Sequence, residues 1–183
     1  LQCYQYVNNC MGDFITAVKG SPLASNTVIG ITGDHASVQI KAKYPDGIFL
    51  NKASPFYLYV PIPILERTKH LYDPERIGSH KDVMPTLYSL SLSNAPYYSV
   101  GGRNMLAEQD NPAKAFAYNI RLFMDANGAC AIGEDFSNTW HTWKDKRSLK
   151  SDSEAMPESV AEKIRDYERL YRWQINARIA GLK

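Results

Sequence analysis

Asn26-Thr-Val-Ile-Gly-Ile-Thr-Gly-Asp34-His35 is a run of strand-forming residues that ends in an acid and an imidazole. Residues 27–32 are β-branched at every position but one and do not alternate apolar with polar, which predicts a strand covered on both faces in a parallel sheet. In open α/β sheets, ligands bind beyond the carboxyl ends of the strands. Asp34 and His35 are therefore candidate metal ligands. We expect Gly33 to give the backbone the freedom to turn, so that both side chains reach one ion.

An amphipathic helix is expected before this strand. Apolar residues between Leu1 and Val18 recur with the i, i+3, i+4, i+7 spacing of a helix, and Gly20 and Pro22 end the pattern. A helix that leads after a short loop into a buried strand forms one half of a βαβ unit. We therefore expect that the chain starts inside a domain and that the preceding strand is missing.

The residues after His35 predict further secondary-structure elements. Residues 36–54 show no sustained period and predict an irregular excursion, whereas residues 56–62 predict a second strand that prolines close. A helix is expected to begin near Ser79, with Ser79 or Asp82 as its cap and Pro85 in its first turn. Asp82 is expected to act as this cap.

The C-terminal third contains a turn signal and a long amphipathic pattern. Asp125-Ala-Asn-Gly128 lies between two strand candidates, residues 114–120 and 129–132, and predicts a hairpin. Residues 148–158 are rich in Ser, Asp and Glu and are typical of a linker. From Pro157 onward, apolar residues follow one stripe and charged residues the other, which predicts an amphipathic terminal helix.

Composition limits the classes of protein that fit. The 183 residues are 44% hydrophobic and 22% charged, which argues against disorder, and a net charge of +2 gives no electrostatic case for a nucleic-acid partner. No run of about 18 apolar residues is present, so we expect no transmembrane segment in this chain. The three cysteines form no C-x-x-C pair, which argues against a zinc-thiolate site.

Two groups of segments resemble the sulfatase-like branch of the alkaline phosphatase superfamily. The first is Tyr6-Val-Asn-Asn-Cys-Met-Gly-Asp-Phe-Ile-Thr-Ala-Val-Lys19 followed by residues 25–35, because in that branch a helix of this kind leads to a strand that ends in a metal-binding Asp-His. The Gly-Asp-His form is most similar to lipoteichoic acid synthase and related phosphoglycerol transferases. The second is Gly78-Ser-His-Lys-Asp-Val-Met-Pro-Thr-Leu87 followed by Gly101-Gly-Arg-Asn-Met-Leu106, which is similar to the family's Asp-x-x-Pro-Thr helix and its later Gly-Arg/Thr-x-Leu-Leu segment.

The resemblance implies a fold and a division of the chain. The fold class is α/β, with an alkaline-phosphatase-like sheet flanked by helices, and a C-terminal portion made of a small β-hairpin and the terminal helix. Residues 1–106 would be the C-terminal half of the catalytic domain, and residues 107–183 would belong to the same domain or form a small subdomain. The family's nucleophile and its remaining metal carboxylate lie on an earlier strand, so we expect this piece to be inactive alone. Ala36-Ser37 replaces the glycine that commonly follows Asp-His in the family.

The resemblance also implies a function. It indicates part of a metal-dependent phosphotransferase or hydrolase that acts on phosphate or sulfate esters, most concretely a phosphoglycerol-type transferase on anionic membrane lipid headgroups. Asp34 and His35 would hold a divalent ion, which polarises the ester oxygens. The resemblance favours Mn²⁺ or Mg²⁺, with Zn²⁺ and Ca²⁺ as alternatives. The catalytic domain would lie on the outer side of the bacterial inner membrane, tethered by helices upstream of this chain.

Alternatives remain open for the function and for single residues. A true sulfatase would need an upstream Cys-x-Pro/Ser-x-Arg site, and a superfamily member without catalysis would bind lipid or protein instead. Asp34 and His35 could simply end a strand. His80, at a helix N-terminus, is a candidate catalytic residue that contacts an anionic substrate. The alternative is a histidine that orients other groups of the site or caps the helix. The segment Trp140-His-Thr-Trp143 resembles a headgroup platform, but aromatic clusters more often fill a core edge.

Overall fold

The computed structural model describes residues 2–35, 49–92, 96–108, 111–119, 121–132 and 139–181. Its helices are α1 (Gln2–Lys19), α2 (Ile62–Leu65), α3 (Val83–Ser91) and α4 (Glu158–Ile179), and its 3₁₀ turns are η1 (Leu50–Lys52), η2 (His80–Asp82) and η3 (Pro112–Lys114). Its strands are β1 (Ile29–Thr32), β2 (Phe56–Tyr59), β3 (Phe116–Asn119), β4 (Leu122–Asp125), β5 (Gly128–Ala131), β6 (Thr139–Asp145) and β7 (Lys150–Ala155). Most of the expected excursion, residues 36–48, lies outside the described residues.

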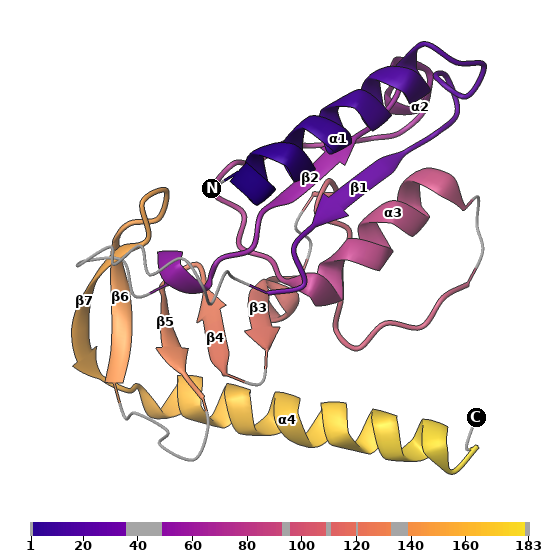
Figure 1. Ribbon diagram of the computed structural model, residues 1–183. Coiled ribbons are helices and arrows are strands. Elements are labelled where there is room, and N and C mark those ends of the chain that lie inside the picture. The colour runs from indigo at the N-terminus through magenta and orange to yellow at the C-terminus, as the bar shows by residue number, and fades with distance from the viewer. Residues whose placement is uncertain are drawn as a thin grey trace.

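The N-terminal half places a two-stranded sheet between helices. In Figure 1, α1 runs along one side of β1 and β2, and α3 lies on the other side. Gly30 allows α3 to approach closely, because a Cβ atom at this position would lie 3.2 Å from a methyl group of Leu87. The expected helix before the strand, the second strand and the helix after Ser79 are all present. Across the described ranges, no helix is both long enough and apolar enough to span a bilayer.

The prediction of a parallel, fully covered strand is wrong. β1 pairs with β2 in the antiparallel direction, with Ile29 opposite Tyr59 and Thr32 opposite Phe56. Its residues alternate between half-buried and exposed, so it is not covered on both faces. A β-branched run reports strand propensity, but it carries no information about the direction of the neighbouring strand. That direction depends on where the chain returns after the site.

The C-terminal half is a five-stranded antiparallel sheet in the order β3-β4-β5-β6-β7, with α4 packed along it (Figure 1). The predicted turn at Asp125 is confirmed, because its Oδ1 accepts hydrogen bonds from the backbone amides of Asn127 at 2.9 Å and Gly128 at 3.3 Å. The strand that enters the turn is β4, however, not residues 114–120, which mostly form β3. The expected small hairpin is thus two strands of a larger sheet.

The linker assignment of residues 148–158 is also wrong. Most of this segment is β7, which pairs with β6 from Lys150 to Ala155. β7 lies at the sheet edge and its side chains are almost all exposed, so a polar composition is compatible with a strand there. The terminal helix is confirmed, since α4 begins directly after Pro157 and buries Ile164 and Tyr167.

The core of the second sheet is aromatic and lies between the sheet and α4. Phe123, Cys130 and Ile164 are fully buried at its centre. Trp140 is 3% exposed and joins this cluster, while Trp143 packs edge-on against Phe49 at a ring-centroid distance of 5.5 Å. The aromatic segment that begins at Trp140 therefore fills the core and its edge and does not form an exposed platform.

Cys130 is expected to resist thiol reagents in the native protein. Burial raises the pKa of its thiol to about 11, so thiolate is scarce near neutral pH, whereas Cys3 and Cys10 are exposed. Titration with a chromogenic disulfide at about pH 8 should label two thiols quickly and the third only after unfolding. Three thiols of equal reactivity would contradict this core.

The same thiol gives the stability a pH dependence. The pKa of Cys130 is raised in the folded state, so its contribution is complete below the unfolded value and is lost as the pH rises toward about 11. Urea unfolding should therefore show falling stability above about pH 9, and Cys130→Ala should flatten the slope. An identical slope in this variant would assign the alkaline loss to other groups.

Candidate functional site

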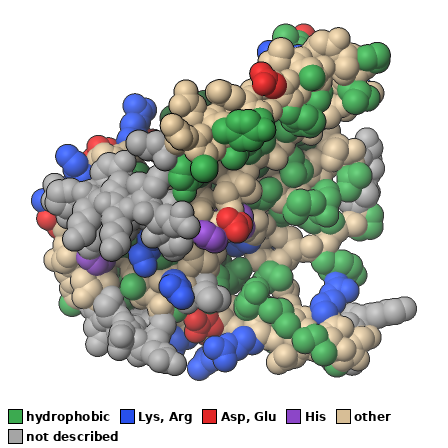
Figure 2. All heavy atoms as spheres, viewed as in Figure 1, with side chains coloured by type: hydrophobic (Ala, Val, Ile, Leu, Met, Phe, Trp, Pro, Cys, Tyr) green, Lys and Arg blue, Asp and Glu red, His purple; other side chains and the backbone are tan. Residues whose placement is uncertain are grey.

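A cleft of about 870 Å³ opens between the end of β1 and the face of β3 and β4. The residues on its wall that bear on chemistry are Asp34, His35, Lys52, Arg76, His80 and Arg121. In Figure 2, acidic and histidine side chains meet near the middle of this face, with basic side chains below them. The structure therefore places both sequence-predicted metal ligands and the candidate His80 on one concave surface.

Asp34 and His35 leave β1 together and lie side by side. The backbone amide of His35 donates a hydrogen bond to Asp34 Oδ1 at 2.9 Å, and Asp34 Oδ2 lies 3.6 Å from His35 Nε2. The side chains are 90% and 65% exposed, respectively. Among the described glycines, positive φ occurs at Gly101 and Gly181, so the turn at Gly33 does not require left-handed geometry.

The donor set of this pair is compatible with a divalent ion. Carboxylate oxygen and neutral imidazole nitrogen suit Mn²⁺ or Zn²⁺, and oxygen-rich sets suit Mg²⁺ and Ca²⁺. In the part of the chain that the structure describes, no group of three or more His, Cys, Asp or Glu side chains gathers as a complete site. Asp34 and His35 therefore fit an ion as two members of a larger ligand set.

His80 contacts the backbone directly before the pair. Its Nε2 lies 2.7 Å from the carbonyl oxygen of Gly33, although 47 residues separate the two positions in sequence. A carbonyl only accepts, so Nε2 carries the proton and donates. His80 belongs to η2, at the start of α3. The His80 ring thus contacts the candidate site through the main chain of Gly33.

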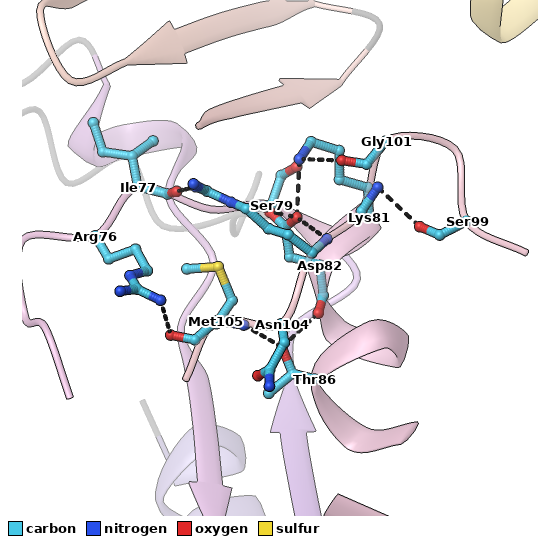
Figure 3. Close-up of polar contacts among 12 residues, drawn as sticks. Arg76, Ile77, Ser79, Lys81, Asp82, Thr86, Ser99, Gly101, Asn104 and Met105 are labelled. Carbon is cyan, nitrogen blue, oxygen red and sulfur yellow. Dashed lines mark hydrogen bonds and ion pairs between the residues drawn. The ribbon is translucent and has the colours of Figure 1, made fainter. Parts of the chain in front are cut away.

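A buried carboxylate organises the turn that carries His80. Asp82 is 1% exposed, and its Oδ1 accepts from Lys81 Nζ at 2.9 Å and from the Arg103 amide at 3.0 Å. Its Oδ2 accepts from the Ser79 amide at 3.0 Å, which with the Ser79 side chain forms a capping box (Figure 3). Ser79 is therefore the N-cap of this helix start, and Asp82 is the third residue of its capping box. Asp82 also occupies the N-cap position of α3, but it makes no side-chain cap hydrogen bond there. The pairing of Asp82 with two cations was not revealed by sequence spacing.

The cations beside Asp82 are themselves partly desolvated. The side chains of Lys81 and Arg103 are 10% and 12% exposed. Burial lowers the pKa of Lys81, and the negative charge of Asp82 opposes that change. Burial also lowers the pKa of Arg103, again against the opposing charge of Asp82. The Asp82 carboxylate therefore offsets part of the free-energy cost of burying both cations.

The loop after α3 is fitted closely to the same turn. A Cβ atom at Gly102 would lie 2.0 Å from the Lys81 carbonyl oxygen, so no side chain fits there. The Thr86 hydroxyl donates to the Asp82 carbonyl at 2.7 Å and accepts from the Met105 amide at 2.9 Å (Figure 3). Residues 78–87 and residues 101–106 are separate segments of the sequence, and the structure packs them together.

The basic residues of the cleft were missed by sequence reasoning. Lys52 is the last residue of η1, Arg121 precedes β4, and Arg76 lies in the loop before η2, so no common spacing links them. Arg76 Nη1 donates to the carbonyl of Met105 at 2.7 Å. The lysines that sequence proximity suggested, Lys41 and Lys43, lie outside the described residues.

Comparison of the chain with protein-family models, curated proteins and solved structures finds no match.

Proposed function

We propose that this chain contributes the Asp-His half of the metal site in a phosphotransferase or hydrolase with an alkaline-phosphatase-like fold. The enzyme acts on phosphate or sulfate esters, most concretely as a phosphoglycerol-type transferase on anionic lipid headgroups. The observation that carries the proposal is the adjacency of Asp34 and His35 on the wall of the cleft, with their polar atoms 3.6 Å apart.

Charge in the cleft supports an anionic substrate. Lys52, Arg76 and Arg121 lie on its wall, whereas Asp82, one of the two acids among the described wall residues, is already engaged by Lys81 and Arg103. Basic side chains around a concave site attract an anionic ester and orient it. Because Asp82 is engaged, Asp34 is the carboxylate that faces the open space of the cleft.

Each residue has a definite role in this proposal. Asp34 and His35 hold the divalent ion, with Mn²⁺ or Mg²⁺ favoured and Zn²⁺ or Ca²⁺ as alternatives. When bound, such an ion supplies charge stabilisation to the ester oxygens and lowers the pKa of the attacking group. Lys52 and Arg121 hold the remainder of the anion. By the resemblance, the nucleophile is not among residues 1–183, and the enzyme is tethered to the bacterial inner membrane with its catalytic domain outside.

The intact protein that carries this chain provides the test. We expect calorimetric titration to show Mn²⁺ binding, and a chromogenic phosphodiester to be cleaved faster with Mn²⁺ than after chelation. The matched sulfate ester separates the two enzyme classes. Faster turnover of the sulfate ester would replace the transferase by a sulfatase. Absence of both ion binding and turnover would contradict the proposal and leave a binding protein.

A further inference from the structure

We infer that His80 is a positioning residue that sets the orientation of the Asp34-His35 pair by holding the Gly33 carbonyl. The inference rests on the proposed function for its effect on an ion, but the contact itself stands on geometry. The Nε2–H of His80 donates to that oxygen across 2.7 Å. The contact joins the end of β1 to the start of α3, two elements that are distant in sequence.

The carbonyl that His80 holds belongs to the peptide unit that leads into Asp34. A peptide unit is planar, so the direction of the Gly33 oxygen also fixes the amide and Cα atom of Asp34. The Asp34 side chain is 90% exposed, which leaves it few contacts of its own to define its direction. A hydrogen bond at the preceding oxygen therefore fixes the backbone position from which the carboxylate extends.

His80 can perform this task because its own turn is firmly anchored. The neighbouring Ser79 amide and the Arg103 amide both bind the buried Asp82 carboxylate, at 3.0 Å each. The Ser79 hydroxyl in addition accepts from the Tyr118 amide of β3 at 3.2 Å. The turn is thereby tied to α3, to the loop at Arg103 and to the second sheet. Movement of the Asp34-His35 turn relative to these elements would break the His80 contact.

This geometry distinguishes His80 from a substrate-binding or ion-binding group. Its donor nitrogen is already committed to a backbone oxygen, and its contribution passes through the main chain to the pair. Removal of a group that orients a metal ligand without touching the ion typically lowers metal affinity about 10-fold to 100-fold. We expect the lower end of that range, because the His80 ring is exposed and water can replace part of the bond.

The test compares His80→Ala with His80→Gln in the full chain. The amide nitrogen of glutamine can donate in place of Nε2, whereas alanine cannot. In metal-free protein, amide hydrogen exchange at His35 should be faster in His80→Ala than in the wild type, and His80→Gln should restore much of the protection. Calorimetry should show about a tenfold loss of Mn²⁺ affinity in His80→Ala and partial recovery in His80→Gln.

His70 offers a matched control, because it is also exposed and contacts a backbone carbonyl, that of Thr68 at 3.2 Å, away from the site. His70→Ala should leave both readouts unchanged. Unaltered exchange and affinity in His80→Ala would overturn the inference. So would wild-type exchange combined with equal Mn²⁺ loss in both His80 variants, which would place the ring on the ion. If the wild type binds no Mn²⁺, the proposed function fails, while the exchange data still decide whether His80 holds the turn.

Discussion

Asp34→Ala is expected to abolish detectable Mn²⁺ binding and to lower turnover in the intact enzyme by orders of magnitude. In the proposed function the carboxylate provides one of the two ion contacts of this chain, and loss of the ion would remove its charge stabilisation of the ester. Folding should be largely kept, because the side chain is 90% exposed and surface substitutions usually change stability by about 0.5 kcal/mol or less. Calorimetric Mn²⁺ titration, phosphodiester turnover and thermal unfolding followed by circular dichroism measure the three quantities.

Asp73 supplies a control whose carboxylate also accepts a hydrogen bond from a nearby backbone amide. Its Oδ1 accepts from the Glu75 amide at 2.9 Å, much as Asp34 Oδ1 accepts from the His35 amide, but it is not part of the cleft wall. Asp73→Ala should therefore bind Mn²⁺ and turn over substrate as the wild type does. Unchanged turnover in Asp34→Ala would remove the central support for an enzyme. Equal losses in both variants would point to a general effect of removing a surface charge.

The N-terminal elements were predictable because each has a strong local signal. The helical spacing of apolar residues defines α1, the β-branched run defines β1, and Pro85 with the Ser79 cap defines the start of α3. The direction of β1 against β2 was not predictable. It depends on tertiary pairing, which strand propensity does not describe.

The C-terminal sheet was only partly predictable, because its strands are short and its edge is polar. β3, β4 and β5 have four residues each, which is too few for a clear alternation to emerge. The turn at Asp125 carried the one strong signal. β7 contains Lys150-Ser-Asp-Ser-Glu-Ala155, whose polarity imitates a linker. Pairing with β6 overrides that local preference.

The candidate site was likewise predictable where its residues are neighbours in sequence, but not where they are far apart. Asp34 and His35 are neighbours in sequence, so their proximity could be inferred directly. The contact of His80 with Gly33, and the contact of Asp82 with Arg103, join residues 47 and 21 positions apart. No residue pattern encodes such distances. Gly102 gave a partial signal, since glycine allows a close approach of backbone segments, and a Cβ atom there would lie 2.0 Å from the Lys81 carbonyl oxygen.

Asp82→Asn is expected to destabilise the protein by about 3 to 5 kcal/mol, the usual result when one partner of a buried ion pair is removed. The substitution keeps the shape of the side chain but removes the carboxylate charge that Asp82 provides to Lys81 and Arg103, whose side chains are 10% and 12% exposed. It also weakens the acceptor that holds the Ser79 and Arg103 amides. Urea unfolding followed by circular dichroism measures the change in the free energy of unfolding.

Asp152→Asn is the matched control, because Asp152 pairs with Lys144 at 2.6 Å while both side chains stay more than half exposed. Surface ion pairs contribute about 0 to 1 kcal/mol, so this variant should remain close to the wild type. Adding Lys81→Met to Asp82→Asn should recover part of the loss, because one uncompensated charge is removed along with its desolvation cost. If Asp82→Asn cost no more than Asp152→Asn, charge at position 82 would not stabilise the turn that carries His80. Capping geometry alone would then have to account for the conformation of that turn.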